Sequence, residues 1–434
     1  MKLTIEKVVV GGQGLARVPA EVEEIGGMRA FVPFTLPGEI VEAELREQHH
    51  GYCTAFVRQI ERASSFRTQP PCPWFGTCGG CQLQHGMYSH QLEIKREMLS
   101  EALRRAGVRE LAAVASIAGE PLAYRNRIRL QVQTHPNFAI GYRHTKSHRI
   151  TPIDHCPIAA PLLQQCIARF PGIAQQEMTY STLQEVELFT NHDQTELLAT
   201  FWVRPSGKFE TERWRGFLKA LQKQIPQLTG ADVLAEEKTK TQTARPLLEW
   251  GQKSLRYSVG GRDYTVSRGS FFQTNLNVLH AFVEAAIEGD GGKLAWDLFA
   301  GAGLFSLALA GKFDEVVAVE SSPSACRDFK INLREKNAAL FRSSVLDFLQ
   351  KAARQSPAPD LVLLDPPRAG LGVEGCGLLA RCGPSRITYV SCDPATLGRD
   401  LAALIQSGYR LQQLQLVDMF PQTHHLETIA RLYR

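Results

Sequence analysis

Four short apolar runs in the second half of the chain constrain its fold more than any other feature. They read LAWDLFA from residue 294, EVVAVE from 315, LVLLD from 361 and ITYVS from 387. Runs that are apolar on both faces are typical of buried parallel strands, and helical stretches lie between them. We therefore expect an α/β domain with a doubly wound, Rossmann-like parallel sheet.

The chain has 434 residues, which is too long for one typical domain, and its pattern changes along its length. Residues 1–60 alternate strand patterns with glycine turns, as a small β-barrel does. Residues 61–82 hold several prolines and cysteines, and 116–262 alternate strand patterns with turns. We predict a barrel over 1–60, a central β-rich domain over 61–82 and 116–262, and the α/β domain over 83–115 and 263–434.

Composition narrows the setting in which the chain works. No run of about 18 apolar residues is present, so no membrane helix is expected. The ten cysteines do not look like a disulfide scaffold, and a reduced cytoplasm is the expected location. Residues 61–150 carry thirteen Lys and Arg against six acidic residues. This local excess favours a polyanionic partner.

The first apolar run leads into DLFAGAG, which places Gly301 and Gly303 between a strand and a helix. Glycines there let the backbone approach a ligand closely. Glu320, at the end of the second run, suits a bidentate contact to ribose hydroxyls. The third glycine of the dinucleotide fingerprint is missing, so S-adenosylmethionine is expected rather than a nicotinamide or a flavin. Asp347 follows a third strand pattern, where an acid can contact adenine; an exposed acid that opens a helix fits equally well.

Three further motifs carry reactive side chains. Asp365 ends a strand in LLDPPRAG, Cys392 ends the next strand in VSCDPATL, and Glu427 closes DMFPQTHHLE. Carbon 5 of uracil becomes nucleophilic only after a thiolate adds to carbon 6, and a base must later remove the carbon 5 proton. Cys392 is the candidate nucleophile, Asp365 the candidate hydrogen-bonding group for the uracil edge, and Glu427 the candidate base.

Two alternatives use the same motifs differently. Asp-Pro-Pro turns beside a methyl donor often serve amino-nitrogen methyltransferases, in which Cys392 would be incidental. An RNA-binding scaffold that has lost its activity is the other alternative. Trapping of the protein on 5-fluorouridine RNA separates the three, because only the uridine-5 mechanism stalls in that way.

A cysteine cluster lies in the first segment of the predicted central domain. Cys72, Cys78 and Cys81 are spaced C-x5-C-x2-C, and Cys156 in HCPI is a plausible fourth ligand from a distant segment. Ligation by sulfur alone permits either zinc or an iron–sulfur cluster, and the spacing does not decide between them. The sequence therefore predicts a metal centre of one of these two kinds.

The segment YRNRIRL places Arg125, Arg127 and Arg129 at alternate positions. Alternate residues share one face of a strand, so these arginines are expected to track RNA phosphates. A solvated strand face is the alternative. Three aromatic residues nearby are candidates for base stacking: Tyr124, Phe138 and Tyr142.

Together with SFFQTN at 270–275, these motifs resemble the RNA uridine-5 methyltransferase family over nearly the whole chain. The family includes the bacterial 23S ribosomal RNA and transfer RNA enzymes. The resemblance implies a class I methyltransferase domain, with the helix at 89–105 packed on it. It makes Cys392 the nucleophile and Glu427 the proton acceptor. It also implies four residues that line the donor site: Gln273, Phe299, Glu320 and Asp365.

The same resemblance favours a [4Fe–4S] cluster that staples the central domain, held by Cys72, Cys78, Cys81 and Cys156. Residues 1–60 resemble the TRAM module, an OB-like barrel of RNA-modifying enzymes. The TRAM module and the four cysteines are typical of the 23S ribosomal RNA branch, so that RNA is the expected partner, and no obligate protein partner is predicted.

Two residues, Asp393 and Leu304, depart from the family pattern. Asp393 stands where the family usually has Asn, and its charge should raise the pKa of the neighbouring thiol unless it points away. Leu304 replaces a commonly polar residue of the glycine loop, so any ligand contact there must come from the backbone.

The target uridine must leave its stack to reach the thiol, and Phe271 or Phe272 is the candidate platform for it.

Overall fold

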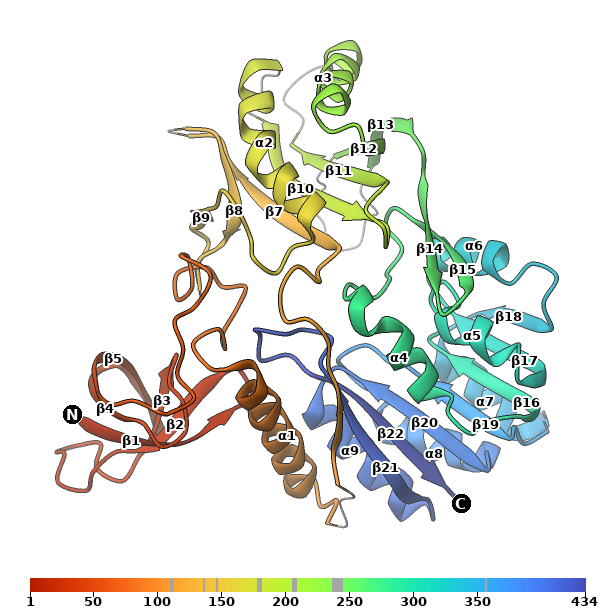
Figure 1. The fold of residues 1–434 in the computed structure, drawn as a ribbon. Coiled ribbons are helices and arrows are strands. Elements are labelled where there is room, and N and C mark those ends of the chain that lie inside the picture. Colours follow the sequence, from red (N-terminus) through yellow and green to blue (C-terminus); the bar gives the residue numbers. More distant parts are fainter. Residues whose placement is uncertain are drawn as a thin grey trace.

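In the computed structural model the described residues are 1–109, 113–135, 137–145, 147–177, 182–204, 209–235, 245–355 and 357–434. They form a closed barrel, two larger sheets and a separate hairpin, with helices packed on the two larger sheets (Figure 1). Within these ranges no helix has the length and apolar character needed to cross a membrane.

Five N-terminal strands close into a barrel: β1 (Lys2–Val9), β2 (Gln13–Arg17), β3 (Arg29–Pro33), β4 (Ile40–His49) and β5 (Tyr52–Arg62). Alternate side chains, among them Leu3, Ile5 and Val32, point inward and are almost completely buried. The predicted barrel is thus confirmed. Its identity as an OB-like TRAM module stays a prediction.

The middle of the chain builds a seven-stranded sheet, here the central sheet, which lies at the top of Figure 1. Two helices pack on it, α2 (Pro161–Glu177) and α3 (Thr211–Gln224), and their aromatic side chains fill its core. The strand order is β13-β12-β11-β10-β7-β8-β9. Their bounds are β7 (Arg127–Gln133), β8 (Ala139–Arg143), β9 (Ile150–Pro152), β10 (Leu183–Thr190), β11 (Leu197–Val203), β12 (Leu228–Ala235) and β13 (Arg245–Gly251).

A hairpin of β14 (Ser254–Val259) and β15 (Arg262–Ser267) follows the central sheet. Its Tyr257 and Tyr264 belong to a hydrophobic core shared with the C-terminal sheet, and Phe189 and Leu198 of the central sheet reach into the same core. The boundary predicted between residues 262 and 263 therefore falls inside this hairpin. The other predicted domain boundaries stay predictions.

The C-terminal part is an eight-stranded sheet in the order β18-β17-β16-β19-β20-β22-β21-β6. The five strands from β18 to β20 run parallel, whereas β22 is antiparallel to both of its neighbours. The predicted doubly wound sheet is confirmed. The strand bounds are β6 (Ala115–Ile117), β16 (Gly292–Leu298), β17 (Phe313–Glu320), β18 (Ala338–Arg342), β19 (Leu361–Leu364), β20 (Arg386–Ser391), β21 (Arg410–Val417) and β22 (Glu427–Tyr433).

Helices cover both faces of this sheet (Figure 1). One core joins α1, α7, α8 and α9 to one face, and a second core joins α4, α5 and the hairpin to the other. Helix α1 ends before Gly107, whose φ of 90° is incompatible with a further helical turn. The helix bounds are α1 (Tyr88–Arg105), α4 (Leu276–Ala286), α5 (Leu304–Leu309), α6 (Pro323–Asn332), α7 (Val345–Gln355), α8 (Gly372–Cys382) and α9 (Pro394–Gln406).

The strand order fixes where a ligand can bind. The chain leaves β16 toward β17 on one side of the sheet and later returns to β19 on the other side. At such a switch point the loops diverge, and a crevice opens at the carboxyl ends of the strands. The glycine loop, Glu320, Asp365 and Cys392 all follow strands at that edge.

Candidate active site

The glycine loop connects β16 to α5 and lies at the switch point. Phe299, Gly301 and Gly303 all have positive φ values, of 64°, 56° and 90°. A Cβ built on Gly301 meets nothing within 4 Å, whereas one on Gly303 would lie 2.4 Å from Leu333. Gly303 is thus required by packing, and Gly301 leaves open space for a ligand. This loop fits a nucleoside-containing cofactor.

Glu320 ties the glycine loop to the end of β17. One carboxylate oxygen accepts the N–H of Gly301 at 2.9 Å, and the other accepts the N–H groups of Ser321 and Ser322 at 2.7 and 2.6 Å. The carboxylate therefore orders the backbone around the expected ribose position. Its contact to the ribose itself stays a prediction.

Asp297 anchors the helix behind the loop. It is completely buried, accepts a hydrogen bond from the Ser306 hydroxyl, and has one oxygen without a partner in the described structure. Burial raises the pKa of Asp297 to about 7. The sequence pattern did not single out Ser306. Leu304 is buried, in accord with a loop that can contact a ligand only through its backbone.

Gln273 and Asp347 differ in their surroundings. Gln273 is 4% exposed in the loop before α4, where Asn275 caps the helix by accepting the N–H of Asn277. Asp347 is exposed in the first turn of α7, where its carboxylate and its N–H both bond the Ser344 hydroxyl. This is the geometry of an acid that opens a helix. A contact of Asp347 to adenine stays a prediction.

The three reactive side chains meet at one edge of the sheet. Ser391 at the end of β20 pairs with Thr428 of β22, so the next residues in register are Cys392 and Glu427. Asp365 directly follows β19, the parallel neighbour of β20. The antiparallel strand thus brings Glu427 to an edge that otherwise carries only the carboxyl ends of strands.

The charges at this edge act on one another. Burial, followed by the negative charges of Glu427 and Asp365, raises the pKa of Cys392 to about 11, and the charge of Arg368 opposes this rise. Burial and the charge of Asp365 raise the pKa of Glu427 well above its usual value. Burial also raises the pKa of Asp365 to about 7. The free site therefore holds a neutral thiol beside two carboxyls that resist ionisation.

Asp393 points away from the thiol. Its carboxylate accepts the N–H groups of Ala395 and Thr396, at 3.0 and 2.9 Å, and caps the N-terminus of α9. It is not among the groups that shift the pKa of Cys392. The departure from Asn at this position thus preserves a helix cap, for which Asp and Asn are about equally good.

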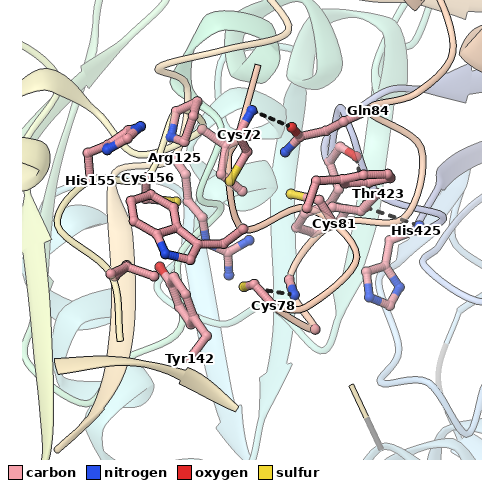
Figure 2. Close-up of a pocket in the computed structure, with 18 of the residues that line it drawn as sticks. Cys72, Cys78, Cys81, Gln84, Arg125, Tyr142, His155, Cys156, Thr423 and His425 are labelled. Carbon is pink, nitrogen blue, oxygen red and sulfur yellow. Dashed lines mark hydrogen bonds between the residues drawn. The ribbon is translucent and has the colours of Figure 1, made fainter. Parts of the chain in front are cut away.

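Four cysteines from two distant segments line one cavity of about 400 Å³: Cys72, Cys78, Cys81 and Cys156. Figure 2 shows their side chains around this cavity, with Tyr142 and His155 beside them. Arg368 and His425, from the loops that hold Asp365 and Glu427, line the same cavity. In the described ranges no group of three or more Cys, His, Asp and Glu side chains is arranged to hold a metal ion.

The predicted arginine track is not a free cationic stripe. Arg127 and Arg129 share one face of β7, as predicted, but each pairs with an acid of β10, Glu187 and Glu185 respectively. Arg129 also stacks over Trp202, with its guanidinium carbon 3.9 Å from the ring centre. These acids lie more than 50 residues away in sequence.

The predicted stacking residues are only partly accessible. Tyr124 and Phe138 are 2% and 5% exposed and belong to the core of the central sheet, so the prediction that they stack bases is wrong. Tyr142 is half-buried at the cysteine cavity. Of the two phenylalanines in SFFQTN, Phe271 is 69% exposed and Phe272 is buried. Phe271 is thus the accessible platform.

Sequence reasoning missed a buried anchor beside the site. Lys95 of α1 and Asp418 are both completely buried and bond at 2.6 Å, and Tyr88 donates to the other oxygen of Asp418 at 2.9 Å. Gln91, also buried, exchanges hydrogen bonds with Gln422. A signal existed, because Gln91 and Lys95 fall on the apolar face of their helix.

Comparisons with known proteins agree with this geometry. Residues 87–434 match the tRNA (uracil-5-)-methyltransferase family. The chain is 33% identical to the 23S rRNA (uracil(1939)-C(5))-methyltransferase RlmD of Shewanella amazonensis, over 98% of this chain and 95% of that one. It is 30% identical to an uncharacterised RNA methyltransferase of Aquifex aeolicus, over 100% and 98%.

A solved structure extends the likeness to the whole fold. The tRNA (uracil-54, C5)-methyltransferase of Pyrococcus abyssi, solved in complex with S-adenosyl-L-homocysteine, superposes with a TM-score of 0.78 at 25% identity and full coverage of both chains. The family match over residues 87–434 includes Cys392, Asp365 and Glu427, which lie together at one edge of the sheet. This protein belongs to the tRNA (uracil-5-)-methyltransferase family and is an RNA uracil-5 methyltransferase.

Proposed function

We propose that the enzyme methylates carbon 5 of a uridine through a covalent adduct between Cys392 and carbon 6 of the uracil. The register of β20 and β22 supports this most directly, because it sets a thiol opposite a buried carboxyl group. An amino-nitrogen methyltransferase needs neither group. Asp393, whose charge raised the idea of an inactive scaffold, serves as a helix cap.

Cys392, Asp365 and Glu427 each act on the uracil in this scheme. The Cys392 thiol gives its proton to solvent and attacks carbon 6 as a thiolate, and the electrons of the double bond move to form an enolate whose carbon 5 takes the methyl group. Asp365 hydrogen-bonds the uracil edge and fixes the ring. Glu427 then removes the carbon 5 proton, the double bond reforms, and the sulfur leaves carbon 6. Burial strengthens Glu427 as a base once it is ionised, because burial raises its pKa.

S-adenosylmethionine supplies the methyl group when it is bound. We place it in the crevice at the switch point, where Gly301 leaves open space. Glu320 would hold its ribose, and Gln273, Phe299, Asp365 and the more distant Asp347 complete the proposed set. The buried Gln273 can hydrogen-bond a ligand without the cost of desolvating a charge, and burial favours the protonated form of Asp365.

We further propose that the four cysteines hold a [4Fe–4S] cluster. Cys₄ ligation is usual for such a cluster. The four cysteine side chains line one cavity of about 400 Å³, although they come from two distant segments. The cluster would join the segment 72–81 to Cys156 and so staple the central domain.

The proposed substrate is 23S ribosomal RNA. Several relatives at 32–33% identity over nearly the whole chain are named as 23S rRNA (uracil(1939)-C(5))-methyltransferases. A TRAM-like role for the barrel accords with its closed five-stranded form. The exposed Phe271 would be the platform on which the uridine stacks after it has left the RNA stack.

A 5-fluorouridine RNA tests the covalent mechanism. Fluorine at carbon 5 cannot be removed as a proton, so the adduct should persist as a band of low mobility on a denaturing gel. Cys392→Ser is the matched control and should give no such band. Absence of the band with the unsubstituted enzyme, while ordinary RNA is still methylated, would favour the amino-nitrogen alternative. Comparing 5-methyluridine in 23S RNA from cells with and without the gene tests the substrate.

A further inference from the structure

The segment 418–426, here the catalytic loop, connects β21 to Glu427 at the start of β22. Glu427 is 3% exposed, and its Oε1 atom has no hydrogen-bond partner in the described part of the chain. Glu427 is the first residue of β22 and pairs with Val417 of β21, so strand pairing and the loop before it together hold its backbone. The contacts of the catalytic loop therefore help to set the direction of its carboxyl group.

Gln82, next to Cys81, contacts the catalytic loop at two points. The N–H groups of Gln82 and Leu83 donate to the Gln422 carbonyl at 3.1 and 3.0 Å. The Gln82 side-chain oxygen lies 2.9 Å from His424 Nδ1 and also accepts the His424 N–H at 3.4 Å. Its side-chain nitrogen donates to the Gly79 carbonyl at 2.9 Å, which fixes the orientation of the amide.

A turn of the N-terminal barrel packs against both Gln82 and His424. The turn between β1 and β2 carries Gly12, whose φ is +76°. A Cβ on Gly12 would lie 2.7 Å from the Cβ of Gln82 and 3.2 Å from the Cβ of His424. The barrel turn thus touches both residues directly. A 2.7 Å ion pair between Lys7 of β1 and Glu101 of α1 holds the barrel beside that helix (Figure 1).

We propose that the β1–β2 turn is a positioning element for the reaction: Gly12 holds Gln82 against His424 and so sets the direction of Glu427. This inference rests on the proposed role of Glu427 as the base. The barrel then acts on a chemical step as well as on RNA. Gln82 is a positioning residue in this scheme, because it acts through the catalytic loop and touches no reacting atom.

The neighbouring glycine provides a matched control. Gly11 also has a positive φ, of +102°, but a Cβ there meets nothing within 4 Å. Gly11→Ala and Gly12→Ala therefore both place alanine in left-handed backbone, whereas only Gly12→Ala pushes on the catalytic loop. Any difference between the two variants reports the contact with Gln82 and His424.

The first measurement is amide hydrogen exchange over residues 418–427 in the full-length protein. Gly12→Ala should raise exchange there several-fold over Gly11→Ala, because the bonds to Gln82 open more often. Equal exchange in the two variants would overturn the proposal. This readout does not depend on which residue is the base, so it stands even if Glu427 proves to have another role.

The second measurement is the fraction of protein bound covalently to ordinary uridine RNA. If Glu427 is displaced, elimination slows more than attack, and Gly12→Ala should accumulate an adduct that Gly11→Ala does not. Gln82→Ala should do the same, and Gln82→Glu, which keeps the acceptor for His424, should largely restore elimination. Slower turnover of Gly12→Ala without adduct, while Glu427→Gln does form adduct, would overturn the positioning of Glu427. Failure of Glu427→Gln itself to form adduct would count against the proposed function instead.

Discussion

Replacement of Glu427 by glutamine should separate the early and late steps of the reaction. The substitution keeps the size of a buried side chain and removes its charge. Burial and the charge of Asp365 raise the pKa of Glu427, and the charge of Glu427 in turn helps to raise the pKa of Cys392. Glu427→Gln should therefore make the thiol ionise more readily while it removes the base.

Loss of one general base typically slows a step about 10²–10⁴-fold, or about 3–5 kcal/mol in the barrier. Attack and methyl transfer do not need this base, so only elimination should slow by that factor. A methylated protein–RNA adduct should then accumulate on ordinary uridine RNA. A denaturing gel detects it, and a labelled methyl donor shows that the adduct already carries the methyl group.

Alkylation of Cys392 by iodoacetamide, followed over pH, gives an independent readout. Its midpoint should lie at lower pH in Glu427→Gln than in the unsubstituted enzyme, because one of the charges that disfavour the thiolate is gone. An unchanged midpoint would refute the electrostatic part of the argument. Cys392→Ala in the Glu427→Gln background is the control and should form no adduct.

Normal turnover by Glu427→Gln would refute its role as the base. His424 and His425 would then be the next residues to test. Burial lowers the pKa of His424 to about 4 and that of His425 to about 3, so both are neutral at pH 7 but are weaker bases than a free imidazole.

Three further substitutions or measurements test other parts of the structure. Asp393→Asn should leave the thiol titration of Cys392 unchanged, and a lower pKa of Cys392 in this variant would contradict the role of Asp393 as a helix cap. Asp393→Ala should cost about 1 kcal/mol in stability through loss of that cap. Lys95→Met leaves the buried Asp418 without its cation, at a cost of about 3–5 kcal/mol, so the variant should unfold at a markedly lower temperature. An unchanged unfolding midpoint would show that the ion pair does not stabilise the fold. Anaerobically purified protein should be brown with about four irons per chain, and Cys156→Ser should lower the iron content; a colourless, zinc-loaded protein would refute the cluster.

Local motifs predicted the part of the site that parallel strands build. The glycine loop, Glu320, Asp365 and Cys392 follow strands that the apolar runs predicted, and in a parallel sheet the ends of such strands lie at one edge. The chemistry of uridine methylation named Glu427 as the candidate base but did not place it at this edge. Its strand is antiparallel and lies between β20 and β21, and no local pattern encodes that insertion.

Long-range pairing accounts for the remaining differences. The alternation of Arg127 and Arg129 was read correctly, but the acids that neutralise them come from β10, a strand more than 50 residues away. Tyr124 lies next to basic residues in sequence and yet points into a core, where its hydroxyl donates to the Pro421 carbonyl at 3.0 Å. The sequence around these residues thus indicated a basic surface, but it did not show which side chains are exposed there and which are paired or buried.

The high pKa of Cys392 has a consequence for the resting enzyme. At a pKa of about 11, roughly one thiol in ten thousand is ionised at pH 7. Peroxides and electrophilic metabolites react with the thiolate form, so the resting cysteine is chemically quiet toward them. Burial, with the charges of Glu427 and Asp365 added to it, thus keeps the resting nucleophile in its thiol form.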